Sequence, residues 1–497
     1  MESKDFQDWV DKLSCLLKKS LGSQGKGILV SRRSPREIFV VKSGAEVLKL
    51  YKKVDPILSI LIQSILRHCE KTGDGGKRMF LFSSNLLRTL ANVYGTRRTE
   101  IISDIIEARH VLYSCREIIP RSDLGLVELK EAVNSVLKSG FRTRFPKQVA
   151  GVLLNLAEEF IRLNLEKYSY LAGYTTGFEE LIRTFPVLVH QEYLNPVSRS
   201  KIVPGVVFNT SLQDTNLEKG ELGLVLLRRQ EEEHVVLELE EDELDMVELQ
   251  VWIRAGEISE NLQNSKIKIV VYEATMSPIL KQRLRQGGIR VVENIGKEEL
   301  GMLAQILNLL PCDGLDLDKL GSISRFSSEP IQLGDRPALN IRTHHSSLII
   351  SAPNKELSRQ YSQTFLDLLR TCSLLWGSYP GVTGTHGEGE KQVAKELSNI
   401  AQEYKTPILD LVSKSILSLQ PPLVIREPKP SNQTLSTDTY SEPLGLVWEI
   451  VDGILETIQQ VLRIQGVYPT RRKISDLNLN SRRLRRVKLS DSDSEED

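Results

Sequence analysis

The sequence predicts an α/β protein of several domains, with helical segments near both ends and a β-α-β pattern between them. The chain has 497 residues, and a single hydrophobic core rarely grows beyond roughly 250 to 300 residues. Apolar residues repeat at helical spacing in segments 55–69 and 444–462. Segments 267–272 and 288–292 have the composition of buried strands and flank a helix that begins at Ser277 and Pro278.

The charge balance argues against nucleic acid or an acidic membrane as a bulk partner. Lysine and arginine total 65 residues, aspartate and glutamate also total 65, and the formal net charge is zero. A protein that attracts polyanions through its overall field carries a clear excess of positive charge. We therefore expect no nucleic-acid partner.

The sequence shows no sign of secretion or membrane insertion. No apolar stretch approaches the ~20 residues needed to cross a bilayer, and the polar start Met1–Asp5 is unlike a secretory signal. The five cysteines are scattered, odd in number and mostly flanked by apolar residues, which is typical of reduced core thiols in a cytoplasmic protein. They are Cys15, Cys69, Cys115, Cys312 and Cys372.

The N-terminal region predicts a short hairpin followed by two packed helices. The apolar runs 28–30 and 38–41 have the length of hairpin strands. Asp55 is a suitable N-cap, and Pro56 suits the first helical position. The apolar residues that follow repeat at helical spacing in two successive segments. They are Leu58, Leu61, Ile62, Ile65 and Cys69 in the first segment, and Met79, Phe80, Phe82, Leu86, Leu87 and Leu90 in the second.

The loop Gly73-Asp74-Gly75-Gly76 between these helices is the clearest candidate for a functional site. Backbone N–H groups at the start of the second helix would be unpaired and would attract an anion. Asp74 would repel that anion unless a cation lay between them, so the loop suggests a nucleotide bound with Mg²⁺. The alternative is a plain glycine-rich turn between core helices. A phosphotransferase P-loop is disfavoured, because Arg78 replaces the hydroxyl residue after the lysine and the glycine spacing differs.

Three other features have a bland and a functional interpretation. The carboxylate-rich run Glu231–Glu248 is expected to be a solvated face, with contact to a client or partner as the alternative. The pair His344-His345 lacks other residues at metal-ligand spacing, so we assign no metal to it. The basic segment 482–488 and the acidic serine segment 490–497 are expected to form a disordered tail, with a phosphorylated docking arm as the alternative.

The order of motifs in the N-terminal region resembles the nucleotide-binding segment of group II chaperonins, the CCT/TRiC and thermosome family. The chain carries, in sequence, the glycine-containing segment 21–27, the segment Ser43–Lys49, the Asp55-Pro56 helix start and the loop 73–77. That family has a phosphate loop, an Asn-Asp-Gly segment, a His-Pro-led helix and a Gly-Asp-Gly-Thr-Thr loop at similar spacing. Four signals in one order are more specific than any single one.

The resemblance extends through the rest of the chain. Pro204–Phe208 looks like the beginning of the family's apical domain, and the β-α-β pattern after it is similar to that domain's core. Pro380-Gly381 and the segment 387–397 resemble the family's Pro-Gly-Gly-Gly-Ala-x-Glu motif and its helix. The helix that Glu442–Leu444 opens resembles the final helix of the family fold.

The resemblance implies the fold of a group II chaperonin subunit, with three domains built from a discontinuous chain. These are a mostly helical equatorial domain, a small intermediate domain and an α/β apical domain. The expected boundaries are 1–135 and 381–497 for the equatorial domain, 136–199 and 340–380 for the intermediate domain, and 200–339 for the apical domain. We expect an exposed loop at 427–441 and a disordered tail from about residue 475.

The resemblance also implies a site for ATP and Mg²⁺. Asp74 is the expected metal ligand and the candidate catalytic residue. The residues expected to bind the cofactor are Gly22, Gly25, Gly44, Thr72, Gly73, Asp74, Gly75, Gly76, Lys77, Gly387 and Gly389.

Departures from the family pattern predict weak or absent ATP hydrolysis. The family's loop continues with threonines, whereas here Gly76, Lys77 and Arg78 follow Gly75, and Ser43 replaces a carboxylate. The segment Tyr361–Leu366 aligns so that Thr364 takes the place of the aspartate that positions the attacking water. Asp367 is expected to be turned well away from that position. Loss of the residue that orients water lowers the rate of hydrolysis by orders of magnitude.

This erosion resembles the chaperonin-like proteins linked to Bardet-Biedl syndrome more than the ring-forming CCT subunits. The resemblance implies a chaperone that assembles BBSome subunits for ciliogenesis and ciliary transport. Its expected partners are CCT/TRiC subunits and other Bardet-Biedl chaperonin-like proteins. Its expected location is the cytoplasm, with the centrosome, basal body or cilium. The alternative is a non-catalytic adaptor that keeps the chaperonin shape without ATP turnover.

Overall fold

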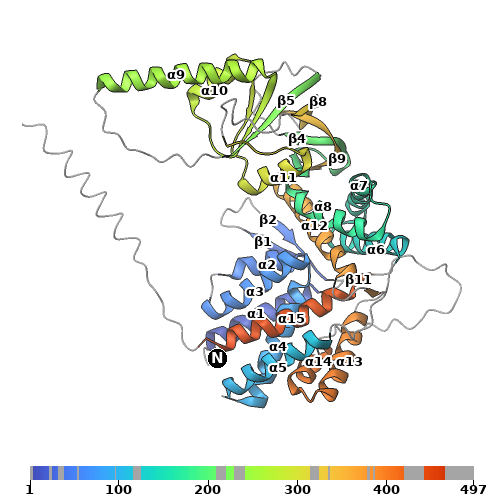
Figure 1. The fold of residues 1–497 in the computed structure, drawn as a ribbon. Coiled ribbons are helices and arrows are strands. Elements are labelled where there is room, and N and C mark those ends of the chain that lie inside the picture. Colours follow the sequence, from blue (N-terminus) through green and yellow to red (C-terminus); the bar gives the residue numbers. More distant parts are fainter. Residues whose placement is uncertain are drawn as a thin grey trace, which may run out of the picture.

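The computed structural model shows a helical lower body, a middle layer of helices and an upper sheet (Figure 1). It describes residues 4–21, 25–31, 38–52, 55–95, 97–115, 125–208, 220–228, 241–313, 324–333, 336–377, 381–383, 387–418 and 441–464. Gly22, most of the predicted loop at 427–441 and the whole charged tail lie outside these residues.

The lower body is built from both ends of the chain. Its buried cluster runs from Phe6 to Leu112 and then from Val393 to Leu462. Its helices are α1 (Lys4–Lys19), α2 (Gly44–Tyr51), α3 (Pro56–Thr72), α4 (Gly76–Tyr94), α5 (Arg98–Cys115), α13 (Glu388–Glu403), α14 (Pro407–Ser418) and α15 (Leu444–Leu462). Its strands are β1 (Ile28–Ser31), β2 (Ile38–Val41), β10 (Val382–Thr383) and β11 (Glu442–Pro443), which pair antiparallel as β1–β2 and β10–β11.

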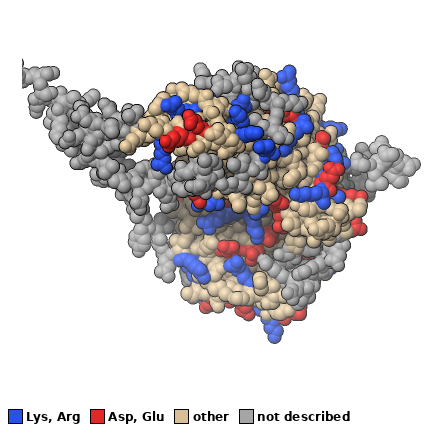
Figure 2. Space-filling model, turned by 45° about the horizontal axis from the view of Figure 1, so that its top comes forward, with Lys and Arg blue, Asp and Glu red and all other residues tan. Residues whose placement is uncertain are grey.

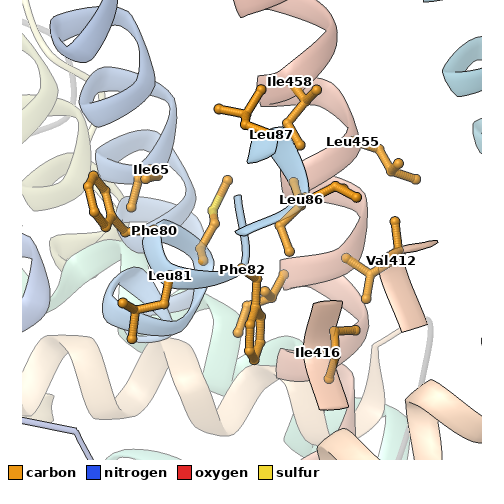
Figure 3. Packing of buried hydrophobic residues seen from close by; sticks show 14 of the residues in the cluster. Ile65, Phe80, Leu81, Phe82, Leu86, Leu87, Val412, Ile416, Leu455 and Ile458 are labelled. Carbon is orange, nitrogen blue, oxygen red and sulfur yellow. The ribbon is translucent and has the colours of Figure 1, made fainter. Parts of the chain in front are cut away.

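Helix α15 fills the centre of this body. It packs against α3, α4 and α5, and both Trp448 and Leu455 on it are almost fully buried. Figure 3 shows Leu455 and Ile458 of α15 among Leu86 and Leu87 of α4, with Val412 of α14 beside them. A fully buried large aliphatic side chain contributes roughly 1.5–3 kcal/mol, so this helix supplies much of the stability of the lower body.

The predicted start of α3 is confirmed in atomic detail. The carboxylate of Asp55 accepts a hydrogen bond of 2.8 Å from the backbone N–H of Leu58, and Pro56 occupies the first turn. The helix ends at Gly73, whose φ of 77° lets its N–H donate back to the carbonyl of Cys69. Glycine adopts this left-handed conformation without steric cost.

A buried ion pair joins the two ends of the chain. Arg78 on α4 lies 3.0 Å from the carboxylate of Glu390 on α13 and also contacts Glu442 on β11. All three side chains are at most 14% exposed. Because a buried charge needs a partner, this contact fixes α4 against segments more than 300 residues away in sequence.

The middle layer consists of α6 (Leu126–Arg144), α7 (Lys147–Leu165), α8 (Leu171–Leu188) and α12 (Lys355–Ser373). Phe365 on α12 is completely buried, and its ring lies 5.4 to 5.9 Å from the rings of Phe141, Phe160 and Phe185. Each of the four helices contributes one of these rings, so the aromatic contacts hold the middle layer together.

Among the described residues, the upper sheet has seven strands, six of them in the order β3-β9-β8-β5-β6-β7, and β4 also pairs with β9. The strands are β3 (Val189–Tyr193), β4 (Lys201–Phe208), β5 (Gly220–Leu227), β6 (Ile267–Tyr272), β7 (Arg290–Val292), β8 (Ser324–Leu333) and β9 (Arg336–Ala352). The helices that accompany it are α9 (Glu241–Asn264), α10 (Pro278–Gln286) and α11 (Lys297–Leu307). The predicted strand at 267–272 and the Ser277-Pro278 helix start are both confirmed.

Strand β9 pairs irregularly with β4, and at the irregularity it is hydrogen-bonded to helix α7 of the middle layer. The register shifts at Gly205, where Pro204 and Gly205 both pair with Ser346, and the side chain of Asn164 from α7 bonds to the backbone of Ser346. The Asn164 amide donates to the carbonyl of Ser346 at 3.2 Å and accepts from its N–H at 3.0 Å. A side chain thus supplies both hydrogen bonds that a neighbouring strand would make.

The expectation that all five cysteines are core thiols is wrong for Cys15. Cys69, Cys115, Cys312 and Cys372 are buried, but Cys15 is exposed. The buried stripe of α1 comprises Phe6, Val10, Leu13 and Leu17, and position 15 falls outside that helical spacing. Apolar neighbours in sequence therefore misled the prediction.

The surface agrees with the balanced composition. Figure 2 shows lysine and arginine interspersed with aspartate and glutamate over the visible face. Among the described residues, none of the helices has the length and apolar character required to span a bilayer.

Replacement of Arg78 by methionine is expected to destabilise the lower body strongly. The change leaves Glu390 and Glu442 buried without their shared cation, and breaking a buried pair in this way costs roughly 3–5 kcal/mol. The midpoint of urea denaturation, followed by tryptophan fluorescence at pH 7, should fall clearly.

The matched control is Lys414→Met, which breaks the pair of Lys414 with Asp410 within α14. That lysine side chain is 67% exposed, so the expected change is within about 0.5 kcal/mol. Equal midpoints for the two variants would show that the buried pair does not hold the chain ends together.

Candidate functional site

The glycine loop between α3 and α4 is pressed against α12. Gly73 has a φ of 77° and Gly75 a φ of 89°, so both need the conformational freedom of glycine. A Cβ atom at Gly73 would overlap the backbone carbonyl of Asp367. The loop therefore meets a middle helix with no space for a larger residue.

The hydroxyl and the carbonyl of Thr72 both take part in hydrogen bonds within the protein. Its hydroxyl lies 2.8 Å from the carbonyl of His68 and 2.9 Å from that of Asp74. Its own carbonyl accepts a hydrogen bond of 3.0 Å from the hydroxyl of Thr371 on α12. The Thr72 side chain is fully buried, so it shapes the loop and is not directed at a ligand.

Asp74 is held by an arginine. Its carboxylate lies 2.9 Å from the guanidinium of Arg144, at the end of α6, and its second oxygen accepts from the N–H of Gly75 at 2.7 Å. Desolvation by the surrounding protein raises the pKa of Asp74, although half of its side chain is solvent-accessible. The positive charges of Arg144 and Arg78 and the Gly75 hydrogen bond outweigh that effect, so the net pKa is lowered. Asp74 is therefore ionised and already neutralised.

The same arginine reaches a second carboxylate. Asp367 on α12 lies 4.0 Å from Arg144 and accepts a hydrogen bond of 2.8 Å from Gln363. Burial raises the pKa of Asp367, the charge of Asp74 adds to that rise, and Arg144 opposes it. The guanidinium, 12% exposed, thus sits between two carboxylates that would otherwise repel each other.

The expectation that Asp367 turns away from the site is wrong. Thr364 and Asp367 line the same cavity together with Lys42, Ser43 and Arg144. Residues three apart on a helix lie on one face, so the step from 364 to 367 keeps the side chain on the side of the loop. The helix presents a carboxylate here, one turn beyond the residue that we aligned with the family's aspartate.

The helix starts around the loop are closely packed. Gly44 is the first residue of α2, and a Cβ atom there would lie 2.8 Å from the backbone nitrogen of Lys77. A Cβ atom at Gly76 would clash with the sulfur of Cys69. The ammonium of Lys77 donates to the carbonyl of Ser20 at 2.7 Å. Burial lowers the pKa of Lys77 to about 8. Gly44, Gly76 and Lys77 are thus brought together with the loop, as a nucleotide site would require.

The other glycines that we predicted to bind the cofactor lie further from the loop. Gly387, with a φ of 82°, precedes α13, and Gly389 packs against Thr383 and Val447. They adjoin the loop indirectly, because Glu390 in the next position pairs with Arg78 on α4. Gly25 lies in the segment after α1, whose end the Lys77 ammonium reaches at Ser20.

A buried histidine lies under the loop. A Cβ at Gly75 would be 3.2 Å from Nε2 of His68, and among the described residues this nitrogen has no hydrogen-bond partner. Burial lowers the pKa of His68 to about 4, and the charges of Lys71 and Arg78 add to the effect. The ring is neutral at physiological pH.

Sequence reasoning missed Arg144, which is the main electrostatic partner of the loop. It lies 70 residues after Asp74, at the end of α6, a helix that the sequence analysis did not predict. The only local signal is the basic last turn of that helix, which is common in helices generally. Its role depends on tertiary packing.

The residues present do not fit Mg²⁺. That ion needs oxygen ligands in near-octahedral geometry, whereas both oxygens of Asp74 are engaged by Arg144 and Gly75. A bound guanidinium also removes the electrostatic attraction for a second cation. In the part of the chain that the structure describes, no group of three or more His, Cys, Asp or Glu side chains has the arrangement of a metal site.

The cavity between α2 and α12 does not fit a nucleotide either. Its volume is about 70 Å³, whereas ligand pockets measure roughly 300–1,000 Å³. Its lining mixes charges of both signs, with Lys42, Lys49 and Arg359 against Glu46 and Glu356. Water fits this space, and a triphosphate with its base does not.

The fold and the glycine loop define a chaperonin-like protein, and comparison with known families agrees. A sequence model of the TCP-1/cpn60 chaperonin family matches residues 13–407. The chain belongs to this family. The predicted α/β multi-domain chaperonin fold is confirmed.

The chain is similar to individual proteins of the Bardet-Biedl branch, as the sequence analysis expected. It is 20% identical to BBSome complex assembly protein BBS10 of Homo sapiens over 331 residues, which are 60% of this chain and 46% of the human protein. It is 21% identical to the Mus musculus protein of the same name over 335 residues, or 60% and 47% of the two chains. The chain spans about half the length of these curated relatives.

The stability of the protein is expected to fall as the pH drops from about 6.5 to about 4. The pKa values of His68, His190 and His345 are each lowered to about 4 in the folded chain, mainly by burial. Unfolding raises them to the ordinary 6.5, so in this interval the unfolded chain binds more protons. Each histidine then lowers the free energy of unfolding by up to ~1.4 kcal/mol per pH unit.

Urea denaturation of His68→Gln between pH 7 and pH 5 measures this contribution. The variant should lose less stability on acidification than the wild type, by about 2 kcal/mol at pH 5. His110→Gln, which changes an exposed ring, serves as the control and should follow the wild-type curve. Parallel pH curves for wild type and His68→Gln would refute a buried neutral His68.

Proposed function

We propose that this chain is a chaperonin-like assembly factor for BBSome subunits that works without efficient ATP turnover. Its partners are CCT/TRiC subunits and other Bardet-Biedl chaperonin-like proteins, and its place of action is the cytoplasm, including the centrosome, basal body or cilium. Family membership and the similarity to BBS10 proteins support the assembly role. Those relatives are named as BBSome assembly proteins, which supports BBSome subunits as the clients.

The observation that carries the second half of the proposal is the position of Arg144. Its guanidinium neutralises Asp74, the residue that the family resemblance assigns to the metal. Thr364, a residue that does not act as a base, faces the same small cavity. A protein that hydrolyses ATP needs a cation on the phosphates and a group that orients water. Here Arg144 neutralises the carboxylate that would hold the cation, and Asp367 accepts a hydrogen bond from Gln363 beside the same guanidinium.

The upper sheet and α9 are the proposed client-binding part. Val251 and Ile253 on α9 are 42% and 52% exposed, and Trp252 between them is covered by the guanidinium of Arg283 at 3.9 Å. Residues two positions apart do not share a helix face, so Val251 and Ile253 expose apolar surface on different sides of α9. Exposed apolar side chains of this kind are suited to an unassembled partner's apolar surface. Helix α9 extends beyond the sheet in Figure 1, so this surface is accessible.

Affinity purification from ciliated cells tests the assembly role. The full chain is expected to recover CCT subunits and BBSome components, identified by mass spectrometry. The double variant Val251→Ser and Ile253→Ser should recover less of the BBSome components, because the exposed apolar surface is removed. Leu29→Ser is the matched control, since Leu29 is 67% exposed on β1, far from α9 in the fold. Repeated absence of both protein groups would contradict the proposal.

A steady-state ATPase assay tests the chemistry. The purified full chain is expected to show no magnesium-dependent turnover above background, and Asp74→Ala should give the same low rate. A magnesium-dependent rate that Asp74→Ala abolishes would overturn the adaptor interpretation and favour a nucleotide-dependent chaperone.

A further inference from the structure

The lower body and the middle layer meet at a polar joint. The Thr371 hydroxyl on α12 donates to the carbonyl of Thr72 at 3.0 Å. The Lys42 ammonium donates to the carbonyl of Thr143 at 3.1 Å. These contacts join elements that belong to two separate buried clusters.

The ion pair of Arg144 with Asp74 is the charged contact at the centre of this joint. Arg144 ends α6, a helix of the middle layer, whereas Asp74 belongs to the loop of the lower body. The distance is 2.9 Å and the arginine is largely shielded from water, so the attraction is stronger than between surface charges. The 4.0 Å approach to Asp367 ties α12 to the same guanidinium.

The surrounding backbone leaves little room for a different arrangement. A Cβ at Gly140 on α6 would overlap the side chain of Leu368 on α12. The loop at Gly73 meets the carbonyl of Asp367 equally closely. The three segments that carry the charges therefore pack directly on one another, and the guanidinium fills the space where their carboxylates converge.

We propose that Arg144 is a permanent internal cation that latches the lower body to the middle layer, so the joint stays closed without any added metal or nucleotide. In this latch the guanidinium supplies the positive charge that two converging carboxylates would otherwise draw from solution. The inference goes beyond the proposed function, because it concerns the joint itself and holds for any client.

Hydrogen-deuterium exchange of the full-length protein tests the latch. The N–H of Gly73 bonds to the carbonyl of Cys69, and the N–H of Met79 bonds to that of Gly75, so peptides covering 72–79 report on the loop. In the wild type, exchange of these peptides should be the same with EDTA as with millimolar Mg²⁺ and ATP. Protection that appears only with Mg²⁺ would overturn the proposal.

Arg144→Ala should speed this exchange by about tenfold or more, the change that ~1.4 kcal/mol of lost opening free energy produces. Adding Asp74→Asn to that variant should restore part of the protection, because the repulsion between the two carboxylates is removed. A merely structural role for the arginine side chain would predict no such recovery.

The matched control is Arg359→Ala. It removes an exposed arginine that, like Arg144, lines the cavity between α2 and α12. It should leave the exchange of 72–79 unchanged. Arg144→Lys keeps the charge and provides a readout if the alanine variant does not fold, with an exchange rate between those of wild type and alanine. If neither Arg144 variant exceeds Arg359→Ala in exchange rate, the latch does not exist.

Discussion

The fold depends on the packing of α15 into the core that α3 and α4 begin. Those two helices present wide apolar faces to the buried cluster, and α15 packs against both. The buried pairing of Arg78 with Glu390 and Glu442 fixes the same closure electrostatically. Because the lower body is closed by the two ends of the chain, the segment between them leaves and returns at one side, where it builds the middle layer and the upper sheet (Figure 1).

The ion pairs of Arg144 at the joint differ from ion pairs on the surface in how much they contribute. Exposed pairs contribute little, whereas the shielded guanidinium of Arg144 serves two carboxylates, the half-exposed Asp74 and the mostly buried Asp367, whose pKa values move in opposite directions. A glycine loop that reads as a phosphate cradle in sequence is, in the folded chain, a packing surface for α12. The chain keeps the chaperonin architecture, and its glycine loop contacts α12 through hydrogen bonds and close backbone packing.

Local signals were sufficient for much of the architecture. Asp55 and Pro56 mark the start of α3, and apolar composition identifies the strand Ile267–Tyr272, because short-range physics decides both. The site was harder to predict. The sequence indicated the loop around Asp74, but Arg144 reaches it only through tertiary packing, and the helical phase of Asp367 was misjudged. Whether a cleft is open or filled depends on side chains from separate segments, which no local pattern reports.

Because both ends of the chain build the lower body, it cannot be completed until α15 has been synthesised. The ribosome releases α3 and α4 long before α15 is made, and at ordinary rates of synthesis their apolar faces wait roughly half a minute for the helix that covers them. During that time the nascent chain exposes the kind of surface that aggregates. A protein of the chaperonin family with this topology is therefore itself a demanding substrate for cellular folding assistance.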